Sequence, residues 1–274
     1  DGKRKGEGEQ RIRLEQPFDA AALEYDSSRP LYPAALYADL LRHVPLTVQS
    51  RVLEIGLGTG KASEPILRTG CSLTGLEPGS NLAALAAERL KGYANLSLLN
   101  GTLQDYAGEG APFDLIYAAT AFHWIEEEYG YRRVFELLRE GGSFARFAYH
   151  AGSDRSRPQL AQQIESLYQQ YMRKGDKPSP PPKEFGREDA EALAGVALRD
   201  GFVEPRSFLY QMTKDFSVEE YLALLRTYPD HMALPEQKRE GLFTGIANAL
   251  QQHGGTLTVF YTVDMELVQK PEKY

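Results

Sequence analysis

The sequence has little of what several classes of protein require. Cys71 is its only cysteine, so it offers no intramolecular disulfide and no cysteine-based zinc site. Its five histidines show no metal-ligand spacing such as His-x-x-x-His. No apolar run is long enough for a membrane-spanning helix. We therefore expect no metal, no membrane partner and a reducing, cytoplasmic environment.

Excess positive charge is also missing. The chain has 31 Lys and Arg residues against 38 Asp and Glu residues, which gives a formal net charge of −7. Nucleic-acid-binding proteins usually carry a basic face that neutralises phosphates. The only basic run here is Lys3–Lys5, near one end of the chain. The charge balance therefore disfavours a nucleic-acid partner.

What is present is an ordinary globular composition, with 42% hydrophobic and 25% charged residues among 274. This length fits one large α/β domain, with or without a sizeable insertion. Residues 1–13 are rich in charge and glycine and contain no apolar stretch. We expect them to form a flexible leader and not a secretory signal, with one domain over residues 14–274.

The segment 51–150 alternates short apolar runs with amphipathic stretches. This alternation predicts a parallel sheet covered by helices, which is an α/β fold. The predicted strands are Arg51–Ile55, Ser72–Leu76, Leu96–Leu99, Phe113–Ala118 and Ser143–Tyr149, and the predicted helices between them are Ala62–Arg68, Ser80–Leu90 and Tyr129–Leu138.

Helical and strand patterns also flank this core. Residues 14–50 predict a helical cap, 151–200 and 217–253 predict inserted helices that would form a substrate lid, and 255–270 predict a last strand. The proline-rich stretch Lys177–Lys183 is incompatible with a helix interior. It fits either a linker between domains or a surface loop within an insertion, and the strand pattern that follows it favours the loop.

The strongest local signal is the run from Leu53 to Gly60, Leu-Glu-Ile-Gly-Leu-Gly-Thr-Gly, in which a strand leads directly into a glycine-rich turn and a helix. Glycine lets the backbone turn tightly and approach a ligand closely beside a helix N-terminus. Glu77 ends the second strand, about 20 residues further on, where nucleotide-binding α/β folds place an acid on the ribose hydroxyls. The alternative for Glu77 is a solvated carboxylate at a strand end, and its offset from the turn favours the ribose role.

The glycine spacing separates two classes of nucleotide-binding protein. A dinucleotide dehydrogenase has Gly-x-Gly-x-x-Gly, whereas here the third glycine comes one residue early and Lys61 stands in its place. The pattern Glu-x-Gly-x-Gly-x-Gly instead resembles motif I of class I S-adenosylmethionine (SAM)-dependent methyltransferases. An NAD(P)-dependent dehydrogenase is therefore the more distant alternative.

The resemblance continues along the chain. Glu77 to Leu82 is similar to the acidic strand end and adenine-packing residue of this family, and Asn100 to Asp105 to its adenine-edge segment. Phe122-His123-Trp124 resembles a variant found in methyltransferases of the trans-aconitate type, and Tyr25 to Pro33 resembles an N-terminal element of the same group.

This resemblance implies a Rossmann-like class I methyltransferase fold. Such a fold has a seven-stranded, mostly parallel sheet with an antiparallel last strand and helical lid insertions. It also implies SAM as the cofactor, S-adenosylhomocysteine (SAH) as the product and a small-molecule methyl acceptor. By resemblance, the cofactor-binding residues would be Tyr25, Arg29, Glu54, Gly56, Gly58, Gly60, Glu77, Pro78, Leu82, Thr102, Leu103, Thr120 and Phe122.

Catalytic residues are less directly indicated. SAM is an activated methyl donor, so in-line displacement mainly requires alignment and exclusion of water. His123, just after the fourth strand, is the candidate general base, with a structural hydrogen bond as its alternative role; His150, which ends the fifth strand, is a weaker candidate. Trp124 is expected in the core under the following helix. A non-catalytic protein that binds SAM or a partner and retains the fold is the alternative to an enzyme.

Overall fold

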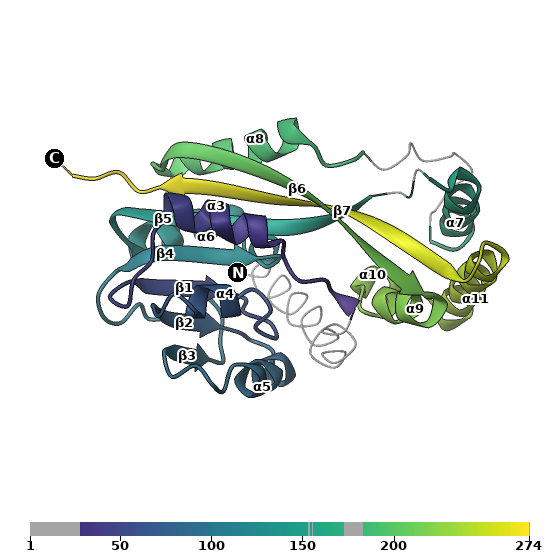
Figure 1. Cartoon of the computed structure of the whole chain (residues 1–274), viewed down its shortest axis with the longest axis horizontal. Helices are drawn as coiled ribbons and strands as arrows, with labels where there is room; N and C mark the ends of the chain where they lie inside the picture. Colours follow the sequence, from purple (N-terminus) through teal and green to yellow (C-terminus); the bar gives the residue numbers. More distant parts are fainter. Residues whose placement is uncertain (1–27, 153, 155, 173–182, 274) are drawn as a thin grey trace, which may run out of the picture. The chain divides into compact units, whose positions relative to one another are not determined.

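The computed structural model describes residues 28–152, 154, 156–172 and 183–273 (Figure 1). The chain forms two compact units. We call Leu31–His150, Phe185–Gln211 and Thr262–Tyr274 the sheet unit, and Asp1–Pro30, Ala151–Glu184 and Met212–Tyr261 the helical unit. Tyr25, from the predicted cofactor site, and most of the proline-rich stretch lie outside the described residues.

The strands form one seven-stranded sheet in the order β3-β2-β1-β4-β5-β7-β6. β1 pairs in parallel with β2 and β4, β2 with β3, and β4 with β5. The first three strands have the predicted bounds, whereas β5 is longer at both ends than expected. The strands are β1 Arg51–Ile55, β2 Ser72–Leu76, β3 Leu96–Leu99, β4 Phe113–Ala119, β5 Leu138–Gly152, β6 Val203–Ser217 and β7 Thr256–Gln269.

The last strand of the chain runs against its neighbour β5. Lys270, just after β7, exchanges backbone hydrogen bonds with Gly141 and Gly142 near the start of β5. His150, near the end of β5, lies instead beside Asp264, six residues earlier in the chain than Lys270. As residue numbers rise along β5 they fall along β7, so the sheet is mostly parallel with an antiparallel last strand, as expected.

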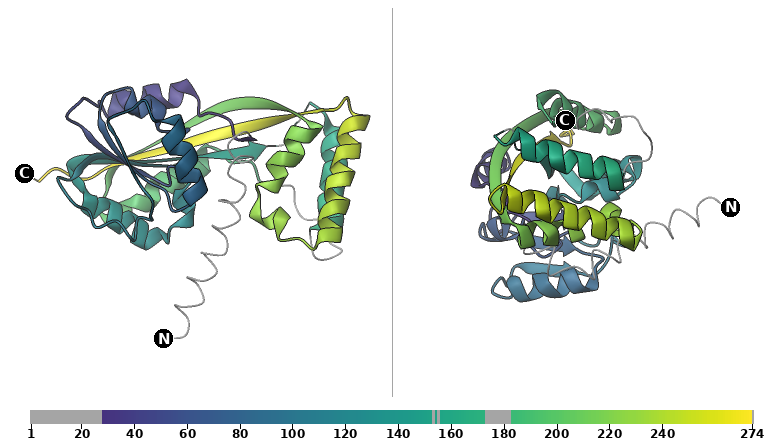
Figure 2. Two further views of the ribbon diagram at one scale, coloured as in Figure 1. Left: turned by 90° about the horizontal axis from the view of Figure 1, so that it is seen from below. Right: turned by 90° about the vertical axis from the view of Figure 1, so that its right-hand side faces the viewer.

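Helices α3 (Ala34–His43) and α6 (Glu127–Leu137) cover opposite faces of the sheet unit, as Figure 2 shows. The alternation of side chains along β5 explains this arrangement, because residues of odd and even number point to opposite faces. Phe147 packs edge-on against Tyr37 of α3, at 6.4 Å between ring centroids. Phe144 packs edge-on against Tyr131 of α6, at 5.8 Å.

The remaining helices of the sheet unit are α4 (Glu64–Leu67), α5 (Ser80–Arg89) and α8 (Arg187–Val196), with short 3-10 helices at Phe122–Trp124 and Ala197–Asp200. The sequence placed α8 in a lid segment. Its residues Leu193 and Ala194 line a narrow gap together with Tyr131 and Phe144. This placement assigns α8 to the layer that covers the sheet.

The helical unit contains α7 (Pro158–Tyr171), α9 (Val218–Arg226), α10 (Pro229–Met232) and α11 (Glu236–Gln252). Two glycines of α11 let α7 approach closely. A Cβ built at Gly241 would lie 2.5 Å from Tyr171, and one at Gly245 would lie 2.5 Å from Leu167. Helix α9 begins at a capping box, in which the Ser217 side chain accepts from the backbone of Glu220 while the Glu220 carboxylate accepts from Ser217 N.

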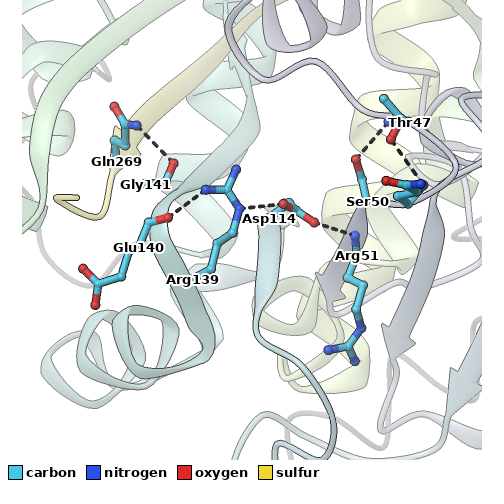
Figure 3. A network of polar contacts seen from close by, with 9 residues as sticks. Thr47, Ser50, Arg51, Asp114, Arg139, Glu140, Gly141 and Gln269 are labelled. Atoms are coloured by element: carbon cyan, nitrogen blue, oxygen red, sulfur yellow. Dashed lines mark hydrogen bonds and ion pairs between the residues drawn. The ribbon is translucent and has the colours of Figure 1, made fainter. Parts of the chain in front are cut away.

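A polar network closes the amino-terminal edge of the sheet (Figure 3). The Asp114 carboxylate, at the start of β4, accepts from Arg51 N of β1 at 2.8 Å and from Arg139 Nε of β5 at 2.6 Å. Gln269 of β7 donates to the backbone oxygen of Gly141 at 3.0 Å. The network therefore ties the starts of three parallel strands to the antiparallel one.

Across the part of the chain that the structure describes, no helix is long and apolar enough to cross a membrane.

Candidate cofactor site

The glycine-rich turn follows β1 at the carboxyl edge of the sheet. Gly56, Gly58 and Gly60 all have positive φ angles, of 67°, 60° and 81°, which residues with a side chain rarely adopt. A Cβ at Gly56 would lie 2.5 Å from the Cβ of Ala121, and one at Gly60 would lie 2.6 Å from Leu90. A Cβ at Gly58 would instead project into open space. The turn is therefore packed tightly on two sides and open above Gly58.

Glu54, the fourth residue of β1, is completely buried. Its Oε2 accepts from the hydroxyls of Ser63, at 2.5 Å, and Tyr117, at 2.7 Å. Its Oε1 has no hydrogen-bond partner among the described residues. A buried, unsatisfied carboxylate oxygen is costly, so this atom is a ready acceptor for a cationic donor from a ligand.

The electrostatics of Glu54 agree with that geometry. Burial raises the pKa of its carboxyl to about 7, the two hydroxyl donors oppose the rise, and nearby Glu77 adds to it. The described residues offer hydroxyl donors to this carboxylate and no cationic partner. A positively charged ligand would therefore be electrostatically favoured at this position.

Glu77 follows β2 and is 5% exposed. Its Oε2 accepts from Gly58 N at 2.7 Å and its Oε1 from Gly79 N at 2.8 Å. The carboxylate thus joins the glycine-rich turn to the loop after β2. Each oxygen has a second lone pair, so the same group could also accept from a ligand hydroxyl.

The predicted adenine side of the site lies between β2 and β3. Leu82, on α5, is 8% exposed, Pro78 is exposed, and Leu103 belongs to the hydrophobic core. Asn100 donates to the backbone oxygens of Glu77, at 2.7 Å, and Pro78, at 3.1 Å, and so fixes the loop after β2.

Thr102 forms a local turn with Asp105. Its hydroxyl and its backbone N–H both donate to the Asp105 carboxylate, at 2.7 and 2.9 Å. These bonds lower the pKa of Asp105. The Thr102 hydroxyl and backbone N–H therefore both serve the turn, and the role of Thr102 toward adenine stays a prediction.

Thr120 follows β4 with a φ angle of 51°, a strained conformation for a β-branched residue. Its backbone N–H donates to Phe147 O at 2.7 Å, and its Oγ1 lies 2.6 Å from the Tyr32 hydroxyl. The Tyr32 ring stacks on Tyr149 with 4.4 Å between centroids. Strain of this kind is concentrated at functional sites, and here it falls at the carboxyl end of a central strand.

The three residues Phe122, His123 and Trp124 differ in their surroundings. Phe122 is in the core, with its ring 5.0 Å from that of Tyr131, so its ring contacts protein. His123 and Trp124 are exposed. The expectation of a core Trp124 is wrong: at 37% exposure it lies outside, because Phe122 and Ile125 fill the space under α6. A Cβ at Gly130 of α6 would lie 2.8 Å from Phe122 and 3.0 Å from Ile125.

Arg29, predicted to bind the cofactor carboxylate, belongs to the helical unit. Its guanidinium lies 5.0 Å from the centroid of the Tyr228 ring of the same unit. Its role toward a cofactor stays a prediction.

Sequence reasoning missed three supporting residues. Ser63 and Tyr117 hold Glu54, and Arg89 of α5 donates to both Thr59 O and Thr59 Oγ1 at 3.0 Å. Tyr117 is the register partner of Glu54 across β1 and β4. The two predicted strands could have been aligned side by side, with the glycine-rich turn after the first next to the polar residues after the second. That alignment would have paired Glu54 with Tyr117.

Comparisons with known proteins indicate a methyltransferase. A family model described as a methyltransferase domain matches residues 52–142. An uncharacterised methyltransferase of Geobacillus sp. (strain WCH70) is 31% identical over 153 residues, which cover 53% of this chain and 70% of that protein. A trans-aconitate 2-methyltransferase of Rhizobium etli is 33% identical over 110 residues, which cover 39% of this chain and 41% of that protein.

A solved structure shows the same fold. Phosphoethanolamine N-methyltransferase 2 of Haemonchus contortus, in complex with phosphomonomethylethanolamine and SAH, superposes with a TM-score of 0.51 at 17% identity. The superposition covers 93% of this chain and 58% of that one. The chain spans about half the length of the methyltransferases of Oceanobacillus iheyensis and Saccharomyces cerevisiae that it also matches, at 50% and 47%.

Three observations together define the class of this protein. They are the fold, the glycine-rich turn between two buried acids, and these relatives. The chain belongs to the class I SAM-dependent methyltransferases.

The residues present fit the cofactor of that family. SAM carries an ammonium group, and the unsatisfied Oε1 of Glu54 is a buried acceptor for it. SAM also carries a ribose with two hydroxyls, and a carboxylate such as that of Glu77 accepts hydrogen bonds from hydroxyl groups. The space above Gly58 leaves room for a ligand against the turn.

Proposed function

We propose that this chain transfers a methyl group from SAM to a small-molecule acceptor by in-line displacement. The observation that carries the proposal is Glu54, a fully buried acid with one oxygen lacking a partner among the described residues, beside an open glycine-rich turn. When bound, SAM supplies an activated methyl group.

The residues of the chain would bind and orient. Glu54 would accept from the ammonium of the cofactor, directly or through water, and Glu77 from the ribose hydroxyls. Leu82 would pack on the base, while the backbones of Gly56 and Gly58 follow the methionine portion. The strained Thr120 and its partner Tyr32 would face the reacting end, because ligands of open α/β sheets sit at the carboxyl ends of the central strands. In this arrangement the protein contributes alignment and exclusion of water.

A small molecule is the acceptor class that the chain favours. A net charge of −7 without a long basic run argues against a nucleic-acid acceptor. The relative from Rhizobium etli is named for trans-aconitate, a small acid, which supports an acceptor of similar size.

Isothermal titration with SAM, SAH and NADH tests the cofactor assignment. We expect micromolar binding of the two sulfur compounds and none of NADH. Glu77→Gln should weaken SAH binding by about tenfold or more, because a charge-assisted hydrogen bond contributes about 1.5–3 kcal/mol. Failure of SAH to bind a folded protein would contradict the proposal.

A pair of glycine variants sharpens the test. Gly58 and Gly254 both have positive φ, of 60° and 97°, and both have open space where a Cβ would project. Gly58→Ala and Gly254→Ala therefore both introduce backbone strain, but only the first fills the candidate site. We expect both variants to lose stability and only Gly58→Ala to lose SAH affinity. A screen of candidate acceptors with isotopically labelled SAM then tests methyl transfer.

A further inference from the structure

A second cluster of titratable groups lies within the sheet unit, where β5 and β7 extend past the end of β4. His150, the last residue of the sheet unit on β5, follows Tyr149, which stacks on Tyr32. The Tyr32 hydroxyl lies 2.6 Å from Thr120 Oγ1, directly after β4. His150 thus lies beyond the end of β4 at the carboxyl edge of the sheet, and its side chain is on the opposite face of β5 from Tyr149 because successive strand residues alternate.

His150 is held by a buried acid. Its Nε2 lies 2.5 Å from Asp264 Oδ1 on β7, and the Asp264 side chain is only 2% exposed. Phe185 stacks flat on the imidazole, with 3.7 Å between ring centroids and 9° between planes. The His150 side chain nevertheless remains 30% exposed. One face and one nitrogen of the ring are fixed, while part of the ring stays accessible.

The contact also selects a tautomer. A carboxylate only accepts hydrogen bonds, so Nε2 carries the proton in the neutral ring and Nδ1 carries the lone pair. No described residue bonds to Nδ1. A carboxylate that orients an imidazole in this way is the arrangement by which many enzymes present a general base.

The other charged and titratable groups of the cluster come from β5, β7 and α6. Glu266 lies two residues from Asp264 on the same side of β7, and burial together with Asp264 raises the pKa of Glu266 far above its ordinary value. Arg146 of β5 opposes that rise and donates to the Tyr131 hydroxyl of α6 at 3.1 Å. His150 is thus the one member of this network that is both oriented by a buried acid and open to solvent.

We infer that His150, oriented by Asp264, is the general base for the methyl acceptor, in place of His123. This inference rests on the proposed function and deepens it. Nδ1 of His150 takes the proton of the acceptor atom while that atom's lone pair forms a bond to the methyl carbon. The methyl–sulfur bond breaks with its electron pair remaining on sulfur, and the imidazolium later releases the proton to solvent.

The inference also specifies the acceptor class. A base contributes only where the nucleophilic atom carries a proton at neutral pH, as in a hydroxyl, thiol or ammonium group. A carboxylate acceptor has no such proton. The acceptor is therefore a small molecule that is methylated on a protonated oxygen, sulfur or nitrogen.

The first test needs no acceptor. Diethyl pyrocarbonate acylates unprotonated imidazole nitrogens, and peptide mass spectrometry of the full-length protein gives a separate rate for each histidine. His253 is an internal comparator, because its Nε2 lies 3.1 Å from the amide oxygen of Gln163 instead of a carboxylate. We expect His150 to react faster than His253. Asp264→Asn should slow His150 by about tenfold or more, because an asparagine can favour the wrong tautomer, and Asp264→Glu should restore part of the rate.

SAH titration of the same variants separates this inference from the proposed function. We expect Asp264→Asn to bind SAH as the wild type does. A His150 rate that is below that of His253, or that Asp264→Asn leaves unchanged, would overturn the dyad whether or not SAH binds. Absence of SAH binding to the wild type would overturn the proposed function instead.

The acceptor found by the screen supplies the second test. His150→Gln should lower kcat by about 100-fold or more with little change in KM. His123→Gln is the matched control and should leave both nearly unchanged. Methylation confined to a carboxylate, or a kcat loss in His123→Gln alone, would overturn the inference.

Discussion

The two edges of the sheet use acids in opposite ways. At the amino edge, Asp114 is paired with Arg139, and the exposed fractions of their side chains are 26% and 47% (Figure 3). At the carboxyl edge, Glu54 and Glu77 are buried and accept from hydroxyls and backbone amides. The amino edge is electrostatically balanced by the protein itself, whereas Glu54 at the carboxyl edge has no cationic partner among the described residues and favours a cationic ligand.

This comparison separates acids that contribute to stability from acids that are suited to binding a cationic ligand. An acid with a nearby arginine and solvent around it contributes modestly to stability. An acid buried without a cation raises the free energy of the unliganded protein, and that cost is recovered when a cation binds. Each of the following experiments alters one edge and measures stability, SAH affinity or both.

The largest effect should be the pH dependence of stability that Glu54 causes. Its pKa of about 7 in the folded state lies above the ordinary 4.5, so the folded state retains a proton that the unfolded state releases between these values. This contribution to stability is fully present below about pH 4.5 and is lost as the pH rises through about 7, by up to about 3 kcal/mol.

Urea unfolding without cofactor, at pH 5 and pH 8, measures this effect. The wild type should lose stability between the two values relative to Glu54→Gln, which carries no titrating proton. Parallel pH profiles for the two proteins would contradict a raised pKa at Glu54.

The next effect should be on cofactor affinity. Oε2 of Glu54 accepts both hydroxyl bonds, so a glutamine with its oxygen at that position keeps both and places an amide donor where Oε1 stands. We expect Glu54→Gln to weaken SAH binding at pH 8 by roughly 10- to 100-fold, because a charged partner of the ammonium is lost. Asp114→Asn is the control at the other edge and should bind SAH like the wild type. Equal losses of SAH affinity in the two variants would contradict the proposed difference between the edges.

A smaller effect is expected at the amino edge itself. Asp114→Asn should destabilise the protein by about 1 kcal/mol, since it removes a partly exposed ion pair while one hydrogen bond can persist. The difference from the wild type, measured by urea unfolding, should shrink in 1 M salt, because salt screens exposed pairs. A difference that is independent of salt would show that charge is not the cause.

The smallest net change should come from Thr120→Gly. Glycine relieves the strain at a φ angle of 51°, while the bond to Tyr32 is lost, so two effects of about 1 kcal/mol oppose each other. We expect thermal unfolding to shift by no more than a few degrees. Tyr32→Phe, which removes the bond and keeps the strain, should be the less stable of the two variants, and the reverse order would refute strain at Thr120.

Local pattern predicted the first three strands well. β1, β2 and β3 have the predicted bounds because each is a short apolar run that ends at a turn. Helix α10, Pro229–Met232, was missed because four residues show no periodicity. Trp124 was assigned to the core by its type, whereas the space under α6 is decided by Phe122, Ile125 and the close approach at Gly130.

The site could be predicted only where it is contiguous in sequence. Glu54 and the glycines form one motif, and Glu77 follows at a familiar offset. The contact between His150 and Asp264 joins residues 114 apart in the chain and depends on β7 lying beside β5. No local pattern carries that information, because it depends on the order of strands in the sheet.

A crystal structure of the protein with SAH tests the central claim most directly. We predict the ammonium of SAH within hydrogen-bond reach of Glu54 Oε1, directly or through one water, with the ribose hydroxyls on Glu77 and the chain of the ligand passing over Gly58. Well-defined SAH bound elsewhere, with Glu54 Oε1 still lacking a partner, would contradict the account.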